Sequence, residues 1–216
     1  LRIGTNLASM AAQRALSKTN VELSKNYQRL ASGNRIINSG DDAAGLSISD
    51  NLKAQIRSWK QAERNTNDGI SFVQVAEGGL YEISNILVRM RELSIQAASD
   101  TIGDREREFI NQEVQSLSQE IDRIANSTNF NGTQLLNGEA PNSPLVVQVG
   151  IRNEDADRIE FDTNENSVTA SEIGVDGISA SSADDARSMI DTVDEAMVRV
   201  SSARARLGAM QNKLHS

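Results

Sequence analysis

The sequence contains no cysteine, only two prolines and few aromatic residues. Without cysteine, disulfide frameworks and thiolate metal sites are excluded. Pro141 and Pro144 lie within four residues of each other, so the long stretches on either side are free to form helix. Aromatic residues make up 3% of the chain and hydrophobic residues 38%, which predicts an aliphatic and alanine-rich core. Such a core is typical of thin helical bundles.

Long apolar runs and an excess of positive charge are also missing. No run approaches the roughly 20 residues that a membrane-spanning helix needs, so we expect no membrane insertion. The first ten residues lack the pattern of a cleavable signal peptide, and any secretion is expected to use another route. The net charge of −8 argues against nucleic acid as a partner. Basic residues are interspersed with acidic ones, and we expect no basic stripe.

Seven-residue spacing dominates residues 41–99 and predicts one long helix with several apolar faces. Two sets recur at this step and a third seam points elsewhere: Leu52, Trp59, Val73, Leu80 and Leu87; Ala76, Ile83, Met90 and Ala97; Phe72, Ile86 and Leu93. Such a helix must be covered by several neighbours. At about 1.5 Å per residue it is roughly 85 Å long, which is the geometry of a rod. Close neighbours or a slight bend would explain its glycines, Gly69, Gly78 and Gly79.

Other helices are expected before and after this one. Residues 1–30 carry a weak apolar face, and their helix either docks on its own domain or orders only on assembly. A turn-rich break at 32–40 leads to Asp41 and Asp42, which are expected to cap the long helix. A second helix is antiparallel to the first because the turn at 101–104 is short. The apolar residues of this second helix recur at alternating steps of four and three: Ile110, Val114, Leu117, Ile121 and Ile124.

Beyond the prolines the apolar period changes from helical to two. Residues 145–149 and 158–161 are predicted to form a β-hairpin. A last helix follows Ser182, and its seven-residue seam comprises Val193, Val200, Leu207 and Leu214. No stop signal follows Leu214, so this helix is expected to reach Ser216 with its pattern intact.

Residues that could support catalysis are scarce. The single histidine, His215, is the penultimate residue and has no expected partner. No nucleotide-binding loop and no zinc-ligand spacing occur. Acidic pairs such as Asp184 and Asp185 sit at helix starts, where the helix dipole accounts for them. We therefore predict no enzymatic activity, no metal and no cofactor.

Function is accordingly expected on exposed surfaces. A charged ridge is predicted on the long helix beside Leu93, formed by Arg89, Arg91, Glu92 and Gln96. Arg107 and Glu113 on the next helix are near enough to pair across to it. A mixed patch of this kind suits recognition; the alternative is an ordinary solvated face.

Short motif blocks occur along the whole chain: SGNRI at 32–36, DDAAGL at 41–46, NTNDGIS at 65–71, AEG at 76–78, RELSIQAA at 91–98, EIDRI at 120–124, FNGTQLL at 130–136 and LGAMQNK at 207–213. In this order they resemble bacterial flagellin, the subunit of the flagellar filament. The resemblance covers essentially the entire sequence.

The resemblance implies a mainly α fold, an elongated antiparallel helical rod or coiled-coil bundle with a small β-hairpin region. Residues 1–33 correspond to the inner-tube helix, 34–45 to a connecting spoke and 46–216 to the rod domain. Within the rod, the long helix spans about 46–99, the second helix 104–128, the hairpin region 140–180 and the return helix 183–216. The plan is that of a minimal flagellin without large outer domains, in which the family's closing inner-tube helix is missing after Ser216.

The implied function is that of a structural subunit that polymerises with copies of itself into the filament used for motility. Export unfolded through the flagellar type III apparatus and an extracellular location in the flagellum are expected. The export chaperone is expected to bind only the full-length chain, since it recognises the closing helix. Two alternatives remain: a hook–filament junction protein or other flagellar axial protein, and, more remotely, a cytoplasmic coiled-coil adaptor.

The resemblance also implies specific site residues. A host Toll-like receptor for flagellin is expected to recognise Arg89, Leu93 and Glu113, a surface that would also contact the next subunit. Arg91, Glu92 and Gln96 extend this subunit-contact ridge. A turn is a candidate contact for an assembly factor: Asn131, Gly132, Thr133 and Gln134.

Overall fold

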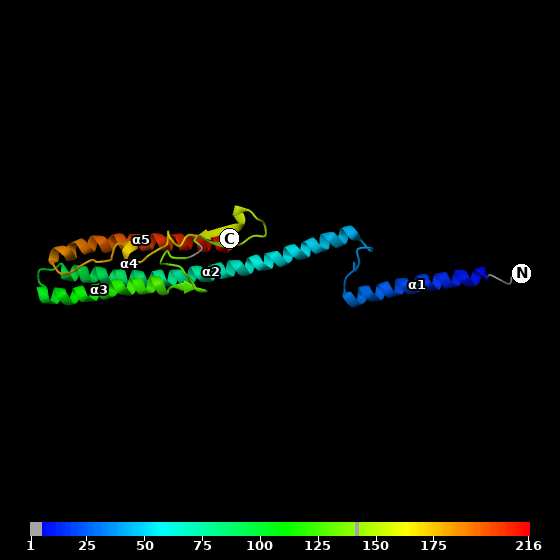
Figure 1. Ribbon diagram of the computed structural model, residues 1–216, viewed down its shortest axis with the longest axis horizontal. Coiled ribbons are helices and arrows are strands. Elements are labelled where there is room, and N and C mark those ends of the chain that lie inside the picture. The colour runs from blue at the N-terminus through cyan, green and yellow to red at the C-terminus, as the bar shows by residue number, and fades with distance from the viewer. Residues whose placement is uncertain (1–5, 141–142) are drawn as a thin grey trace. The chain divides into compact units, whose positions relative to one another are not determined.

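The computed structural model describes residues 6–140 and 143–216, which are mainly helical (Figure 1). The chain divides into two compact units, Leu1–Ser58 and Trp59–Ser216, and each is described by itself. In chain order the elements are α1 (Leu7–Ser32), α2 (Ala43–Ala97), α3 (Asp104–Ser127), β1 (Asn129–Phe130), β2 (Thr133–Gln134), β3 (Leu145–Gln148), the 3-10 helix η1 (Asp155–Asp157), β4 (Arg158–Phe161), α4 (Ala170–Ile173) and α5 (Ala183–His215). The predicted helices and hairpin are confirmed. The ends of the later elements differ from the predicted ones by up to three residues, and the first helix begins at Leu7 among the described residues.

Helix α1 is well capped but exposed along its whole length. The side chain of Asn6 accepts a hydrogen bond from the Ser9 N–H at 3.2 Å, and Gly33 ends the helix at a φ of 68°, a conformation that glycine adopts without strain. No α1 residue is buried. The first five residues of the predicted helix lie outside the described residues. Large apolar side chains are exposed along it: Leu7, Met10, Leu16, Val21, Leu23, Tyr27 and Leu30.

The segment between α1 and α2 is held by two aspartates with different roles. The Asp42 carboxylate accepts a hydrogen bond from the Gly45 N–H at 2.8 Å and so caps α2, as predicted. Asp41 instead lies 3.5 Å from both Lys25 and Arg29 of α1. Burial works against the charged form of Asp41, but hydrogen bonding from the Asn38 backbone and from Lys25 outweighs it and lowers its pKa.

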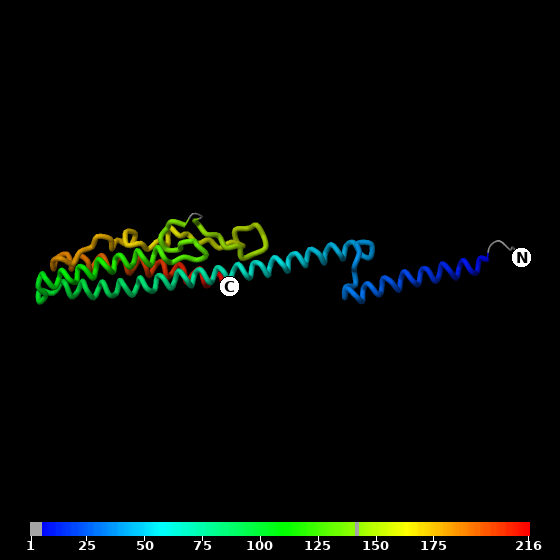
Figure 2. The backbone as a smooth tube through the Cα atoms, turned by 60° about the horizontal axis from the view of Figure 1, so that its bottom comes forward, coloured from blue at the N-terminus to red at the C-terminus, as the bar shows by residue number. Residues whose placement is uncertain are grey.

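In the second unit, α3 and α5 lie side by side with the C-terminal half of α2 (Figures 1 and 2). Ion pairs join Arg89 of α2 to Glu113 of α3 and Arg91 of α2 to Asp194 of α5. Near the other end of α5, Leu214 lies against Gly69. Both neighbours therefore run antiparallel to α2, as the short turn at 101–104 predicts for α3.

The core follows the seven-residue seams only in the C-terminal half of α2. Val73, Leu80 and Leu87 are fully buried, as are Ala76, Ile83, Met90 and Ala97. The facing seam of α5 is buried too: Val193, Val200, Leu207 and Leu214. In contrast, Leu52 is 52% and Trp59 is 56% exposed. The expectation that the seam is covered along the whole helix is therefore wrong for these two residues.

The core-facing register of α3 differs slightly from its predicted seam. Ile110, Val114 and Ile121 are buried, but Leu117 and Ile124 are only half-buried. Ser118 and Ala125, each one residue further on, are buried in their place. The buried face of α3 is thus turned slightly from the predicted seam and includes Ser118, which contacts the segment between β4 and α5.

Three of the four phenylalanines tie the strands to α2. The Phe72 ring lies 5.3 Å from the Phe161 ring of β4 and 6.4 Å from the Phe130 ring of β1, measured between centroids. Strands β3 and β4 pair antiparallel from Leu145↔Phe161 to Gln148↔Arg158. The predicted hairpin thus docks on the bundle through an edge-to-face aromatic contact, a favoured geometry.

The irregular segment between β4 and α5 is held by polar side chains of α3. Asn111 and Asp122 accept hydrogen bonds from the N–H groups of Ala180 and Ala170, at 3.0 and 2.7 Å. Gln115 and Ser118 donate to the carbonyl oxygens of Ile178 and Val175. The four α3 residues recur at steps of four, three and four and so share one face. This polar seam was not anticipated from the sequence.

Of the three α2 glycines that the sequence analysis singled out, Gly69, Gly78 and Gly79, two mark close approaches. A Cβ on Gly79 would lie 2.7 Å from Thr128 Oγ1 and 2.8 Å from Leu136 Cδ1, and one on Gly69 would lie 3.3 Å from both Leu214 and Val147. Nothing lies within 4 Å of a Cβ on Gly78. The close-neighbour explanation therefore holds for Gly69 and Gly79 and not for Gly78.

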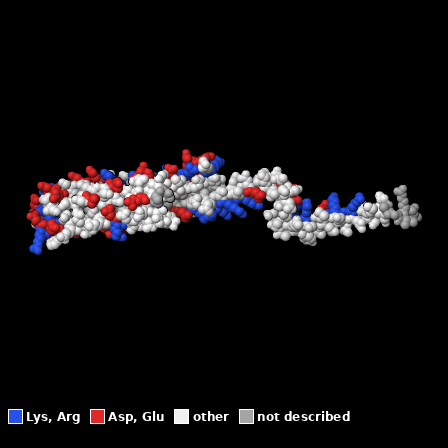
Figure 3. Space-filling view, in the orientation of Figure 1, with Lys and Arg blue, Asp and Glu red and all other residues white. Residues whose placement is uncertain are grey.

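The basic residues are not as evenly interspersed as expected. Four exposed cations recur along α2 at steps of four, three and four: Lys53, Arg57, Lys60 and Arg64. Within each unit two of these cations share a helix face, Lys53 and Arg57 in the first and Lys60 and Arg64 in the second. Figure 3 shows Lys and Arg side chains gathered along part of α2. The sequence analysis did not anticipate this clustering, in which Lys53 also pairs with Asp50 at 3.6 Å. Among the described residues, no helix combines the length and apolarity needed to cross a bilayer.

Candidate functional site

The predicted ridge centres on an exposed cluster that joins α2 to α3. The Arg89 guanidinium donates to Glu113 Oε1 from Nε at 3.0 Å and from Nη2 at 2.9 Å. Its Nη1 donates to Glu92 Oε2 at 3.2 Å. Hydrogen bonding to Glu113, then to Glu92, raises the pKa of Arg89 above its ordinary value. One cation is thus shared between two carboxylates on a solvent-exposed face.

Of the other three ridge residues, two lie on the same face of α2 as Arg89 and one does not. Glu92 and Gln96 are exposed and lie three and seven residues after Arg89, which places all three on one side of α2. Arg91 instead donates to Asp194 of α5, with its Nε 2.6 Å from Oδ1. This hydrogen bond raises the pKa of Arg91. The four residues expected to form one ridge therefore do not all share one face: Arg89 faces α3, whereas Arg91 faces α5.

Leu93 belongs to the core. Only 2% of the residue is exposed, whereas about half of the Arg89 and Glu113 side chains is exposed. In the single chain, Leu93 therefore offers almost no surface for contact. Of the three residues expected to form a recognition surface, the structure brings Arg89 and Glu113 together at the surface and places Leu93 beneath.

Arg107, expected to pair across the helices, has a different role. It is 8% exposed and donates to the carbonyl oxygens of Ala97 at 2.9 Å and Ser99 at 3.0 Å. Its Nη1 also donates to Asp104 at 3.0 Å. It thus supplies a donor to the Ala97 carbonyl at the C-terminus of α2, where helix carbonyls lack partners within the helix. The Ser99 carbonyl, in the turn that follows, also accepts from the Ile102 N–H at 3.2 Å.

An apolar stripe beside the cluster was not predicted from the sequence. Tyr81, Val88 and Ile95 of α2 recur at seven-residue steps and are 52%, 43% and 50% exposed. The Arg204 guanidinium lies over the Tyr81 ring, 5.9 Å from its centroid. The spacing alone could have revealed this stripe, but the two buried seams of the same helix follow the same step.

The candidate assembly-factor turn is a tight β-hairpin. Asn131 and Gly132 join β1 to β2 with φ values of 50° and 81°, as a type I′ turn requires. Both are exposed, and Thr133 and Gln134 are half-buried. The Gln134 side chain donates to the Asn126 carbonyl and accepts from Asn137. Only the tip of the turn is thus open to a partner.

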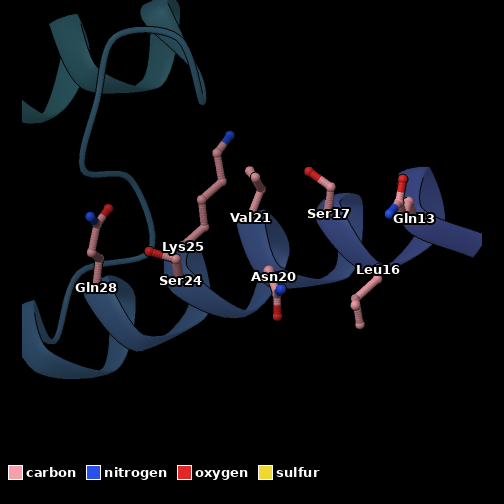
Figure 4. A pocket seen from close by; sticks show the side chains of 8 residues that line it. All are labelled: Gln13, Leu16, Ser17, Asn20, Val21, Ser24, Lys25 and Gln28. Carbon is pink, nitrogen blue, oxygen red and sulfur yellow. The ribbon is translucent and has the colours of Figure 1, made fainter.

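One pocket lies along α1, within the first unit. The pocket in Figure 4 is lined by side chains from α1 alone: Gln13, Leu16, Ser17, Asn20, Val21, Ser24, Lys25 and Gln28. Among the described residues, no group of three or more histidine or acidic side chains is arranged to hold a metal ion.

Comparison with known proteins gives consistent matches. The model of the bacterial flagellin N-terminal helical region matches residues 3–140. The flagellar filament core protein flaB2 of Brachyspira hyodysenteriae is 40% identical over 225 residues, which cover 98% of this chain and 78% of that protein. A flagellin of Halalkalibacterium halodurans is 40% identical over 212 residues, covering 98% of this chain and 76% of that protein.

Solved structures show the same fold. A flagellin of Bacillus cereus aligns with a TM-score of 0.63 and 30% identity, over 71% of this chain and 85% of that one. A Vibrio parahaemolyticus protein assigned to the flagellar hook-associated class aligns with a TM-score of 0.64 but 17% identity, over 82% of this chain and 91% of that one. The second likeness concerns the fold alone. Together, the family match and the relatives across nearly the whole sequence show that this chain belongs to the bacterial flagellin family and is a structural subunit of the flagellar filament.

Proposed function

We propose that the chain has the three parts implied by the resemblance to flagellin. Residues 1–33 form the inner-tube helix of the filament, residues 34–45 form the connecting spoke and residues 46–216 form the rod domain. The observation that carries this assignment is the exposure of α1, which has large apolar side chains and no buried residue. Exposed apolar surface of this kind marks interaction sites, and in a filament neighbouring subunits would cover it. Export through the flagellar type III apparatus, an extracellular location and a non-enzymatic role accompany this proposal.

The export chaperone is proposed as a partner of a chain that carries the family's closing helix. The tip of the turn at Asn131 and Gly132 is proposed as the contact for an assembly factor, since both residues are exposed. Pull-down of the chaperone with the full-length gene product, with and without the closing helix, tests the first assignment. Loss of chaperone binding is expected only in the version without that helix.

We propose that Arg89 and Glu113 form the accessible part of the surface recognised by the next subunit and by the host receptor. Arg89 already neutralises two carboxylates, Glu92 and Glu113, within the chain. A partner that offers its own charges or hydrogen bonds can exchange with these exposed pairs at little energetic cost, because exposed ion pairs contribute little to stability. Leu93 supports this surface from the core and does not contact the partner directly.

A charge swap separates recognition from folding. In Arg89→Glu combined with Glu113→Arg, the two residues can still pair with each other, but each presents the opposite charge to a partner. If the surface recognises partners, both the single and the double variants lose receptor signalling and filament assembly while their unfolding curves stay close to that of the wild type. If the pair serves only folding, the double variant behaves as the wild type in every assay, and the proposal fails.

A matched control lies on α3. Glu120 and Arg123 form another exposed pair, 2.6 Å apart. The corresponding swap, Glu120→Arg with Arg123→Glu, is expected to leave signalling by the monomer unchanged. Leu93→Ala is unsuited to this purpose, because truncating a buried leucine destabilises the core and any loss of signalling would reflect folding.

A further inference from the structure

The sequence holds two Asn–Gly pairs in one short stretch, Asn131–Gly132 and Asn137–Gly138. In such a pair the backbone nitrogen of glycine can attack the side-chain amide carbon of asparagine. The new C–N bond closes a five-membered succinimide and the side-chain nitrogen leaves as ammonia. Water then opens the ring at either carbonyl, giving aspartate or isoaspartate. Glycine favours the attack because no Cβ crowds its nitrogen.

The two pairs differ sharply in their surroundings. Asn131 is exposed, and its side chain makes no hydrogen bond to the residues that the structure describes. Nothing lies within 4 Å of the position that a Cβ on Gly132 would occupy. The attacking nitrogen and the amide carbon of this pair are therefore open to rearrangement and to water.

Asn137 is 8% exposed and fully engaged. Its Nδ2 donates to Gln134 Oε1 at 2.5 Å and to Asn126 Oδ1 at 3.3 Å, and its Oδ1 accepts from the Glu139 N–H at 3.0 Å. A Cβ on Gly138 would lie 3.3 Å from the side chain of Ser167. Rotation of the Asn137 amide toward the Gly138 nitrogen would break these hydrogen bonds in a buried site, where unmade hydrogen bonds are costly.

We propose that Asn131 is a site of spontaneous deamidation in the folded protein and that the fold protects Asn137. To react, Asn131 must leave its left-handed turn conformation. The ladder that holds the turn has only two residue pairs, Asn129↔Gln134 and Phe130↔Thr133, so opening is local and does not require the bundle to unfold. The inference does not depend on the proposed function.

The product differs from asparagine in charge and, for isoaspartate, in backbone length. Each event changes the net charge of the chain from −8 to −9. Isoaspartate adds one carbon to the main chain within a two-residue turn, which the β1–β2 register cannot accommodate. The modification therefore alters the exposed tip of the turn, which lies just before the buried Leu135 and Leu136.

The test compares folded and unfolded protein. The chain is held at mildly alkaline pH and 37 °C, with and without denaturing urea, and is sampled over days. Fragment-ion mass spectrometry then locates the small mass increase that accompanies replacement of the amide nitrogen by oxygen. In the folded protein Asn131 is expected to react at least about tenfold faster than Asn137, a ratio that corresponds to one or two retained hydrogen bonds. In urea the two sites should react at similar rates.

Variants identify the reacting group. Asn131→Gln, whose longer side chain would have to close a less favourable six-membered ring, should lose the rapid reaction and the isoaspartate that accompanies it. Asn137→Gln should still form isoaspartate at Asn131. Equal rates at the two sites in the folded protein, or reaction at Asn131 only in urea, would overturn the proposal. The wild-type comparison needs no variant, so it tests the proposal even if a substitution impairs folding.

Discussion

At the residue scale, a single buried arginine holds the turn between α2 and α3. Arg107 donates to the carbonyl oxygens of Ala97 and Ser99 and to Asp104. The last carbonyl groups of a helix have no partner within the helix. The guanidinium supplies one from α3, so it fixes both the end of α2 and the start of the antiparallel return.

Removing this side chain should destabilise the second unit measurably. Arg107→Ala removes the side-chain donor to the Ala97 carbonyl and one of the two donors to the Ser99 carbonyl, which keeps the Ile102 N–H. We expect a loss of about 1–3 kcal/mol in the free energy of unfolding, measured by urea denaturation. Arg105→Ala is the control, because Arg105 is exposed and makes no ion pair to the described residues. Equal effects of the two changes would contradict the assigned role.

Residue positions within the site were only partly predictable. Helical spacing placed Arg89, Glu92 and Gln96 on one face correctly. It could not place Arg91, whose side chain reaches Asp194, a residue 103 positions away in the sequence. Spacing also could not tell that Leu93 is buried, because its exposure depends on how closely the neighbouring elements of the core pack beside it. Both errors concern contacts between elements, which a local pattern does not contain.

At the scale of elements, two adjacent glycines of α2 face different surroundings. Gly79 lies against Thr128 and Leu136, which hold the end of α3 and the β1–β2 turn close to the helix, whereas Gly78 faces open space. Thr128 cannot move freely, since its hydroxyl donates to the Ile124 carbonyl at 2.7 Å. Leu136 is fully buried. The same substitution at the two positions should therefore have opposite effects.

Gly78→Ala should raise the free energy of unfolding by roughly 0.5–1 kcal/mol, because alanine favours helix over glycine. Gly79→Ala should lower it, since the displacement of packed neighbours typically costs about 1–3 kcal/mol and exceeds this gain. Thermal unfolding of the two variants side by side measures the difference. Stabilisation by both substitutions would show that the end of α3 does not pack against Gly79.

The elements themselves were largely predictable, and the contacts of the irregular segment were not. Strong seven-residue spacing indicated the helices, and alternation indicated the hairpin at β3 and β4. The polar seam of α3 that holds the segment after β4 was not predicted, because Asn111, Gln115, Ser118 and Asp122 individually resemble solvent-exposed side chains. Their role depends on backbone groups some 48–69 residues away.

At the scale of the whole molecule, two stretches present apolar surface without a neighbour among the described residues. One is α1, and the other is the first part of α2, where Ile48, Leu52, Ile56 and Trp59 are each more than half exposed. The sequence showed these as apolar seams but could not show that they remain uncovered. As this chain is a filament subunit, both stretches are expected to be covered in the polymer.

Trp59 offers a direct reporter of this burial, because it is the only tryptophan. Its 56% exposure predicts fluorescence emission at long wavelength in the monomer. On assembly the emission should shift to shorter wavelength and become less accessible to a soluble quencher such as iodide. An unchanged spectrum in filaments would show that this part of α2 stays in contact with water.

The central claim is that the chain polymerises as a filament subunit, and seeded assembly of the full-length gene product tests it most directly. Short flagellar fragments are mixed with monomer, and growth is followed by light scattering and electron microscopy. We predict that the fragments lengthen into filaments in proportion to the monomer added. Monomer that stays folded by circular dichroism yet never extends the fragments, or that binds once at their ends and stops growth as a junction protein would, contradicts the account.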